Sequence, residues 1–252
     1  MNPAFAPVVP GWCGMIPAHP EFIGRRLDRH FIHGMDAWLR AAMLESQQTL
    51  GESWTDRYCN ASVWRFLIAP AVCGEQAHAG ILMSCNDSAG RYFPFIIAAA
   101  LEPAWSAHAV LVDRFGWFKH IERVARDALG HDLPPEAIDE QLSCNPLPPL
   151  GEKIDSALQA AEALKGLLNS STPPASSVHL PGLSSCLDAA SIWGAWTLFE
   201  PLVQRSLWWR ETGRSSCEAL RFDGMPGDQD YVRLLAPISA AAAAATPLPC
   251  TP

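Results

Sequence analysis

Three short apolar runs in the first half of the sequence constrain the fold more than any other feature. They cover residues 63–69 (VWRFLIA), 79–85 (AGILMSC) and 92–100 (YFPFIIAAA), and turn-rich segments separate them. Runs of this length and composition are typical of β-strands. The last two flank a polar turn that contains a glycine, which predicts an antiparallel hairpin. Because the runs are almost continuously apolar, we expect helices on both faces of the sheet.

The rest of the chain supplies further strands and several helices. A strand is predicted at 8–14, followed by a loop from Pro17 to Pro20, since proline cannot extend a strand ladder. Two more strands are predicted at 206–210 and 217–222. Apolar residues at helical spacing, together with glycine and proline stop signals, predict the remaining elements. These helices lie at 31–50, 107–129, 136–145 and 152–168.

Length and composition favour one folded domain. The chain has 252 residues, of which 49% are apolar, and this is enough to build a single sizeable core. We expect that domain to span residues 1–235. Residues 236–252 are mostly alanine, proline, serine and threonine, which offer little apolar bulk, so this tail is expected to be disordered.

Charge and hydropathy exclude several classes of partner. A net charge of −8 has the wrong sign for a nucleic-acid-binding surface. The most apolar stretch, residues 93–101, is far shorter than the roughly 20 residues that a membrane-spanning helix needs, so no membrane insertion is expected. Residues 1–10 lack a secretory signal, and the eight cysteines include no C-x-x-C pair. Reduced thiols and a cytoplasmic location fit best.

Motifs that would carry chemistry are weak or missing. The sequence contains neither of the glycine motifs that bind phosphate groups, G-x-G-x-x-G and G-x-x-x-x-G-K-[ST]. Residues 182–185 come nearest to the G-x-S-x-G motif of serine hydrolases, but they lack its second glycine. His30, His33 and Asp36 have helical spacing for a metal site, but a solvated helix face is the favoured interpretation. His19 could act as a general base, although a surface histidine beside prolines is favoured. Asp87 is interpreted as a turn residue. We therefore expect no metal, no cofactor and no small-molecule substrate.

Tryptophan and arginine residues provide candidates for a protein interface. Ten tryptophans are present, and most must be buried. Neighbouring residues on a strand point to opposite faces, so Trp208 and Trp209 cannot both face a one-sided core. Tryptophan and arginine are enriched at binding hot spots, but coverage of both faces within the fold remains the stronger alternative. The candidate binding residues are Trp64, Arg65, Arg91, Trp208, Trp209 and Arg210.

The order of short motifs resembles that of TagF-like proteins associated with type VI secretion. Residues 11–22 are similar to the opening G-[FWY]-x-G-K-[LI]-P-x-x-x-D-F motif of that family, with Met15 in place of lysine and Glu21 in place of aspartate. The motif loop carries Trp12, Gly14, Pro17, His19 and Phe22. Further blocks similar to those of the family follow in order over about residues 10–235. They lie at 36–39, 63–66, 80–84, 90–94, 206–209 and 224–226.

This resemblance implies a fold and a function. The implied fold is an α/β three-layer α-β-α sandwich with a mixed, largely antiparallel central sheet. The implied function is post-translational repression of a bacterial type VI secretion system, by binding and sequestering its forkhead-associated (FHA) scaffold protein. The family brings no catalytic residues, so we expect a binding protein and not an enzyme. The alternatives are a cryptic hydrolase and a structural accessory component of the secretion apparatus.

Overall fold

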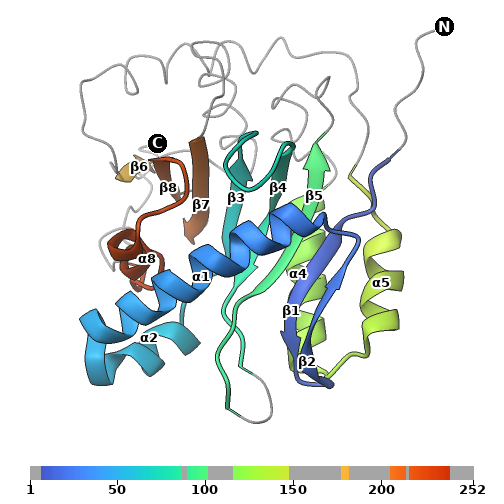
Figure 1. Cartoon of the computed structure of the whole chain (residues 1–252), viewed down its shortest axis with the longest axis horizontal. Helices are drawn as coiled ribbons and strands as arrows, with labels where there is room; N and C mark the ends of the chain where they lie inside the picture. The colour runs from blue at the N-terminus through green and yellow to red at the C-terminus, as the bar shows by residue number, and fades with distance from the viewer. Residues whose placement is uncertain are drawn as a thin grey trace, which may run out of the picture.

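The computed structural model describes residues 7–86, 90–101, 116–147, 177–181, 205–213 and 216–238. The predicted helix at 152–168, the segment 182–185, Asp87 and most of the predicted tail lie outside these residues. Within them, the structure is a mixed α/β fold built on one sheet (Figure 1).

The sheet contains eight strands in the order β2-β1-β5-β4-β3-β7-β8-β6. Every pairing between these described strands is antiparallel. The sheet therefore joins the first and last parts of the sequence, because β3 pairs with both β4 and β7. The strands are β1 (Gly11–Ile16), β2 (His19–Arg25), β3 (Trp64–Ile68), β4 (Ala77–Met83), β5 (Phe95–Leu101), β6 (Ser177–Pro181), β7 (Arg205–Gly213) and β8 (Ser216–Asp223).

The strands predicted from the three apolar runs are confirmed as β3, β4 and β5. The predicted hairpin is also confirmed, since β4 and β5 pair in antiparallel fashion from Ala77–Leu101 to Met83–Phe95. The two strands predicted near residues 206 and 217 are β7 and β8, which are each longer than expected. Strand β6 was not predicted.

The prediction of a loop from Pro17 to Pro20 was wrong. The chain turns at residues 17–18, and β2 begins at His19 and includes Pro20. Strand β2 lies at one end of the sheet and pairs only with β1 among the described strands. Proline is tolerated in an edge strand, because one side of that strand needs no ladder hydrogen bonds. The opening strand also begins later than predicted, at Gly11.

Helix α1 (Arg29–Leu50) confirms the first predicted helix. It starts after Asp28, whose side chain accepts hydrogen bonds from the backbone N–H groups of His30 and Phe31, and it ends at Gly51. Helix α4 covers the second half of the segment predicted at 107–129, whose first residues lie outside the described chain. The other helices are η1 (Gly51–Ser53), α2 (Trp54–Cys59), α4 (Trp117–Gly130), α5 (Pro135–Ser143) and α8 (Asp228–Leu234).

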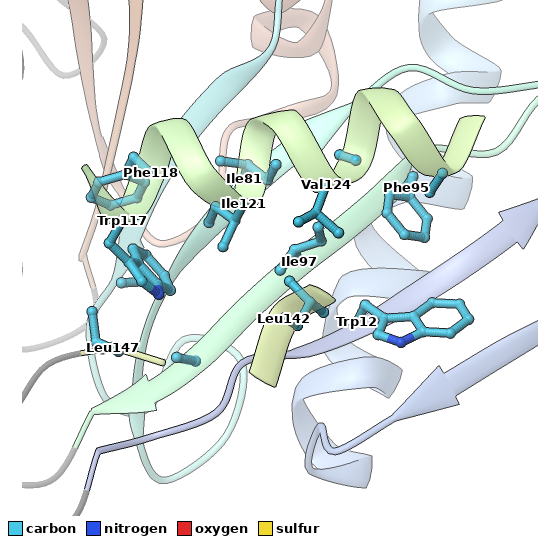
Figure 2. Close-up of a cluster of buried hydrophobic side chains, with 14 of the residues drawn as sticks. Trp12, Ile81, Phe95, Ile97, Trp117, Phe118, Ile121, Val124, Leu142 and Leu147 are labelled. Carbon is cyan, nitrogen blue, oxygen red and sulfur yellow. The ribbon is translucent and has the colours of Figure 1, made fainter. Parts of the chain in front are cut away.

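Two hydrophobic clusters fill the interior. Alternate residues of the same strand enter different clusters: Leu67, Ile97 and Trp209 belong to one, and their neighbours Phe66, Ile96 and Trp208 to the other. Because strand side chains alternate between faces, the clusters lie on opposite faces of the sheet. Helices α4 and α5 contribute to the first (Figure 2), and α1, α2 and α8 contribute to the second. In Figure 1, α1 crosses in front of the strands and α4 runs behind them.

None of the helices in the described part of the chain has the length and apolar character needed to span a lipid bilayer.

Candidate interaction surface

The opening motif forms the β1–β2 hairpin, and two of its residues have structural roles. Gly14 has φ 147°, a conformation that other residues rarely adopt. A side chain at this position would also come within 3.1 Å of the Phe95 ring. Trp12 is fully buried in the first cluster. The glycine and tryptophan of the motif therefore serve the packing of β1 against β5.

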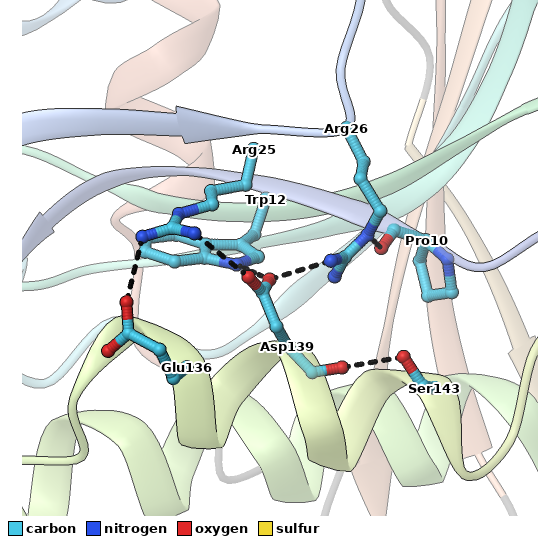
Figure 3. A network of polar contacts seen from close by, with 7 residues as sticks. All are labelled: Pro10, Trp12, Arg25, Arg26, Glu136, Asp139 and Ser143. Carbon is cyan, nitrogen blue, oxygen red and sulfur yellow. Dashed lines mark hydrogen bonds and ion pairs between the residues drawn. The ribbon is translucent and has the colours of Figure 1, made fainter.

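Asp139 of α5 holds the hairpin in place (Figure 3). Its carboxylate accepts a 2.8 Å hydrogen bond from Nε1 of Trp12 and forms ion pairs with Arg26 at 2.8 Å and Arg25 at 3.4 Å. Arg25 also reaches Glu136 at 3.1 Å, and Nε of Arg26 donates to the backbone carbonyl of Pro10. One carboxylate thus satisfies a buried indole N–H and links α5 to β1 and β2.

The other face of β2 is directed towards α1. Phe22, the aromatic residue that ends the motif, remains 43% exposed, and its ring makes an edge-on contact with Phe93. Gly24 follows two residues later on the same face, and a side chain there would lie 2.8 Å from Cδ1 of Ile32. This close approach brings β2 against the first turns of α1.

A surface hollow of about 310 Å³ opens between β2 and α1. It combines apolar side chains with both signs of charge. Helical spacing explains the lining, because residues three and four apart on α1 share one face. The hollow is lined by Phe22, Arg29, Ile32, His33, Asp36 and Arg40.

Some charged residues of the hollow have an ion-pair partner and others do not. Nε of Arg40 donates to both carboxylate oxygens of Asp36, at 2.9 and 2.8 Å, and this contact raises the pKa of Arg40. The side chains of Arg29 and His33, by contrast, make no hydrogen bond or ion pair with any residue that the structure describes. Arg29 therefore contributes to the hollow a guanidinium that has no ion-pair partner among the described residues.

The same side of α1 continues beyond the hollow. Leu44 lies four residues after Arg40 and is 58% exposed, more than any other large apolar side chain in the described chain. Phe22 and Leu44 thus add exposed apolar groups near opposite ends of the polar lining. Exposed aromatic and aliphatic groups beside arginine are typical of protein-binding surfaces.

The structure brings the predicted tryptophan and arginine candidates together but places them inside the fold. Arg65 and Phe66 of β3 pair with Trp209 and Trp208 of β7. Trp64, Arg65, Trp208, Trp209 and Arg210 are all at most 3% exposed. Trp208 packs against Trp38 of α1, and Trp209 packs against Phe118 of α4, so both faces are covered within the fold.

The two buried arginines are held by acidic side chains of α4, β7 and β8. Arg65 pairs with Glu122 at 2.6 Å and with Glu211 at 3.0 Å. Arg210 pairs with Glu218 at 2.7 Å, and its guanidinium lies 4.7 Å from the ring centre of Trp64. Buried charges need such partners, so these arginines connect β3 and β7 to α4 and β8.

The remaining predicted residues lie in different environments. Arg91 is exposed. Pro17 and His19 are half-buried at the hairpin turn, where Nδ1 of His19 lies 3.3 Å from the backbone N of Glu21. His33 and Asp36 line the hollow, as described above. The described residues contain no cluster of three potential metal ligands.

Sequence reasoning missed three lining residues of the hollow, Arg29, Ile32 and Arg40, and also Leu44. Their spacing on α1 is visible in the sequence, but nothing in it shows which side of the helix β2 approaches. Of the six lining residues, the sequence had singled out Phe22 through its place in the motif, and His33 and Asp36 through their helical spacing, but it did not bring them together as one surface.

Three of the sequence blocks meet at Trp38. Its ring lies 5.3 Å from that of Trp208, and its Nε1 donates to the carbonyl of Pro226 at 2.7 Å. Trp38, Trp208 and Pro226 come from separate blocks of the resemblance, so their contact gives these blocks a common structural role.

Comparison with solved structures defines the class of fold. The chain is similar to the crystal structure of PA0076 from Pseudomonas aeruginosa PAO1, with a TM-score of 0.64 and 22% sequence identity over 96% of this chain and 100% of that chain. This likeness shows a shared fold. A search of curated proteins found no match.

Residues 11–144 match the family model of the TagF N-terminal domain, described as type VI secretion system-associated. The match includes the β1–β2 hairpin, the hollow and Asp139. The chain therefore belongs to the TagF N-terminal domain family, which confirms the resemblance found in the sequence.

Proposed function

We propose that this chain is a post-translational negative regulator of a bacterial type VI secretion system, acting in the cytoplasm by binding and sequestering the FHA-domain scaffold protein. The observation that carries this proposal is membership of a family associated with type VI secretion. The motifs that mark the family build the hairpin and its neighbouring helix, and the exposed hollow lies between these two elements. A surface of this kind is suited to recognition of another protein.

The proposed fold is the three-layer α-β-α sandwich implied by the family resemblance, with residues 1–235 as one domain. Support comes from the two apolar clusters on opposite faces of the sheet, each supplied by helices. In such a fold the central sheet positions α1 rigidly. A helix held in this way loses little conformational entropy when a partner binds.

Calorimetry with purified components tests the function. The full chain is titrated into the FHA-domain scaffold of the same secretion system, and a saturable complex is the expected result. Overproduction of the chain in cells should then reduce release of a secreted substrate, while the level of the scaffold stays unchanged.

The same experiments separate this proposal from a structural role in the secretion apparatus. A structural accessory component would copurify with the assembled apparatus in fixed proportion, and extra copies would not reduce secretion. Absence of any complex between the chain and the scaffold would refute the sequestration proposal.

A further inference from the structure

The charge of the hollow between β2 and α1 differs from that of the chain as a whole. The chain carries a net charge of −8, yet the hollow contains two arginines, one histidine and one aspartate. The ion pair between Asp36 and Arg40 neutralises one arginine. What remains is the unpaired guanidinium of Arg29, with the imidazole of His33 one turn further along the helix.

Neighbouring acidic groups of the described chain form no ion pair with this guanidinium. The carboxylate of Asp28 stays charged, but it is directed to the start of α1, where it accepts hydrogen bonds from the backbone N–H groups of His30 and Phe31, and these lower its pKa. Glu21 precedes Phe22 in β2, so its side chain leaves the strand on the opposite face. The guanidinium of Arg29 is therefore available to pair with a negatively charged group of a partner.

The hollow also offers apolar contacts beside that charge. Phe22 is exposed and Ile32 is half-buried, and both line the hollow. Neither group needs to move, because Phe22 is held by its contact with Phe93 and Ile32 by the close approach of Gly24. The hairpin itself is fixed by Asp139. The surface is thus already in a shape that can bind.

We infer that this hollow is where the chain binds its protein partner, and that it takes an acidic segment carrying one apolar side chain. The apolar side chain packs against Phe22 and Ile32, and a carboxylate of the same segment pairs with Arg29. A second acidic group next to it lies within reach of His33. The inference rests on the proposed function for the identity of the partner, and it adds which face is used and the chemistry of the segment that occupies it.

Three variants of the full chain test this inference by calorimetry with the FHA-domain scaffold. Arg29→Glu reverses the free charge, and Phe22→Ala removes the exposed ring. Arg126→Glu is the matched control, because Arg126 is exposed on α4, on the opposite face of the sheet, and has no ion pair with a described residue. All three side chains are exposed, so each variant should stay folded, with a free energy of unfolding within about 1 kcal/mol of the parent.

The expected result is a Kd raised about tenfold or more by Arg29→Glu and by Phe22→Ala, and changed less than about twofold by Arg126→Glu. Added salt should weaken binding of the parent chain more than binding of Arg29→Glu. Equal affinity for the parent and Arg29→Glu would overturn the inference and leave the proposed function standing. No binding by the parent chain would overturn the proposed function and this inference with it.

Sedimentation of the chain alone tests a different occupant of the hollow. The parent chain is expected to show the same association state as Arg29→Glu. A dimer that Arg29→Glu dissociates would show that a second copy fills the hollow, and it would overturn the inference.

Discussion

Replacing Asp139 with alanine should destabilise the protein by removing the group that anchors the motif hairpin. Trp12 is fully buried, so its indole N–H would lose its 2.8 Å acceptor without gaining access to water. An unsatisfied buried donor costs about 1–3 kcal/mol. The side chains of Arg25 and Arg26 are 39% and 33% exposed, so their ion pairs add only about 0–1 kcal/mol.

The expected loss for Asp139→Ala is therefore about 2–3 kcal/mol in the free energy of unfolding. For a domain of this size, such a loss lowers Tm by roughly 5–10 °C. Urea unfolding followed by tryptophan fluorescence measures the free energy, and calorimetry measures Tm. Both measurements report on the folded chain without any partner.

Two controls separate the hydrogen bond from the ion pairs. Asp139→Asn keeps an acceptor for the indole and should lose only about 1 kcal/mol. Glu136→Ala removes a side chain that is 74% exposed and should have little effect. If Asp139→Ala unfolds at the same urea concentration as the parent chain, the carboxylate does not anchor the hairpin and the reasoning fails.

Three other predictions follow from burial. Trp208→Ala should lower the free energy of unfolding, measured with urea, by about 3–5 kcal/mol, because it empties a fully buried site. Phe22→Ala should lower it by less than about 1 kcal/mol, because Phe22 is exposed, and equal losses for the two variants would contradict this prediction. Burial lowers the pKa of His78 from 6.5 to about 4. As the pH falls, His78 is therefore protonated in the unfolded chain before it is protonated in the folded chain, and this favours unfolding. The free energy of unfolding should then drop by up to about 3 kcal/mol between pH 6.5 and pH 4, and His78→Leu should lack that drop; an unchanged pH profile would refute the assignment. Iodoacetamide should modify the exposed Cys59 in the native protein. It should modify Cys13 only after denaturation, because burial hides this thiol and raises its pKa to about 12. Mass spectrometry of the peptides measures both reactions, and labelling of Cys13 in the native protein would contradict the prediction.

Local sequence patterns determined most of the secondary structure that could be tested. Helix α1 was predicted because its buried residues recur at helical spacing and Gly51 stops it, and both signals lie within the segment itself. The β4–β5 hairpin was predicted for the same reason, since two apolar runs flank a short turn. Strand β2 was missed because Pro20 is compatible with a strand only at a sheet edge. The sequence of a strand does not show whether that strand lies at the edge or in the centre of its sheet.

The sequence by itself determined the family, because the order and spacing of short motifs can be recognised without knowing which residues are in contact. It also supplied the correct expectation that adjacent residues such as Trp208 and Trp209 point to opposite faces. The sequence also favoured coverage of both faces within the fold, but only the tertiary structure showed that α1 covers Trp208 and α4 covers Trp209. Only it showed that Phe22 meets Arg29 and Ile32 across a hollow. The physical reason is that burial and proximity depend on how distant segments pack, whereas periodicity records only the preference of each segment.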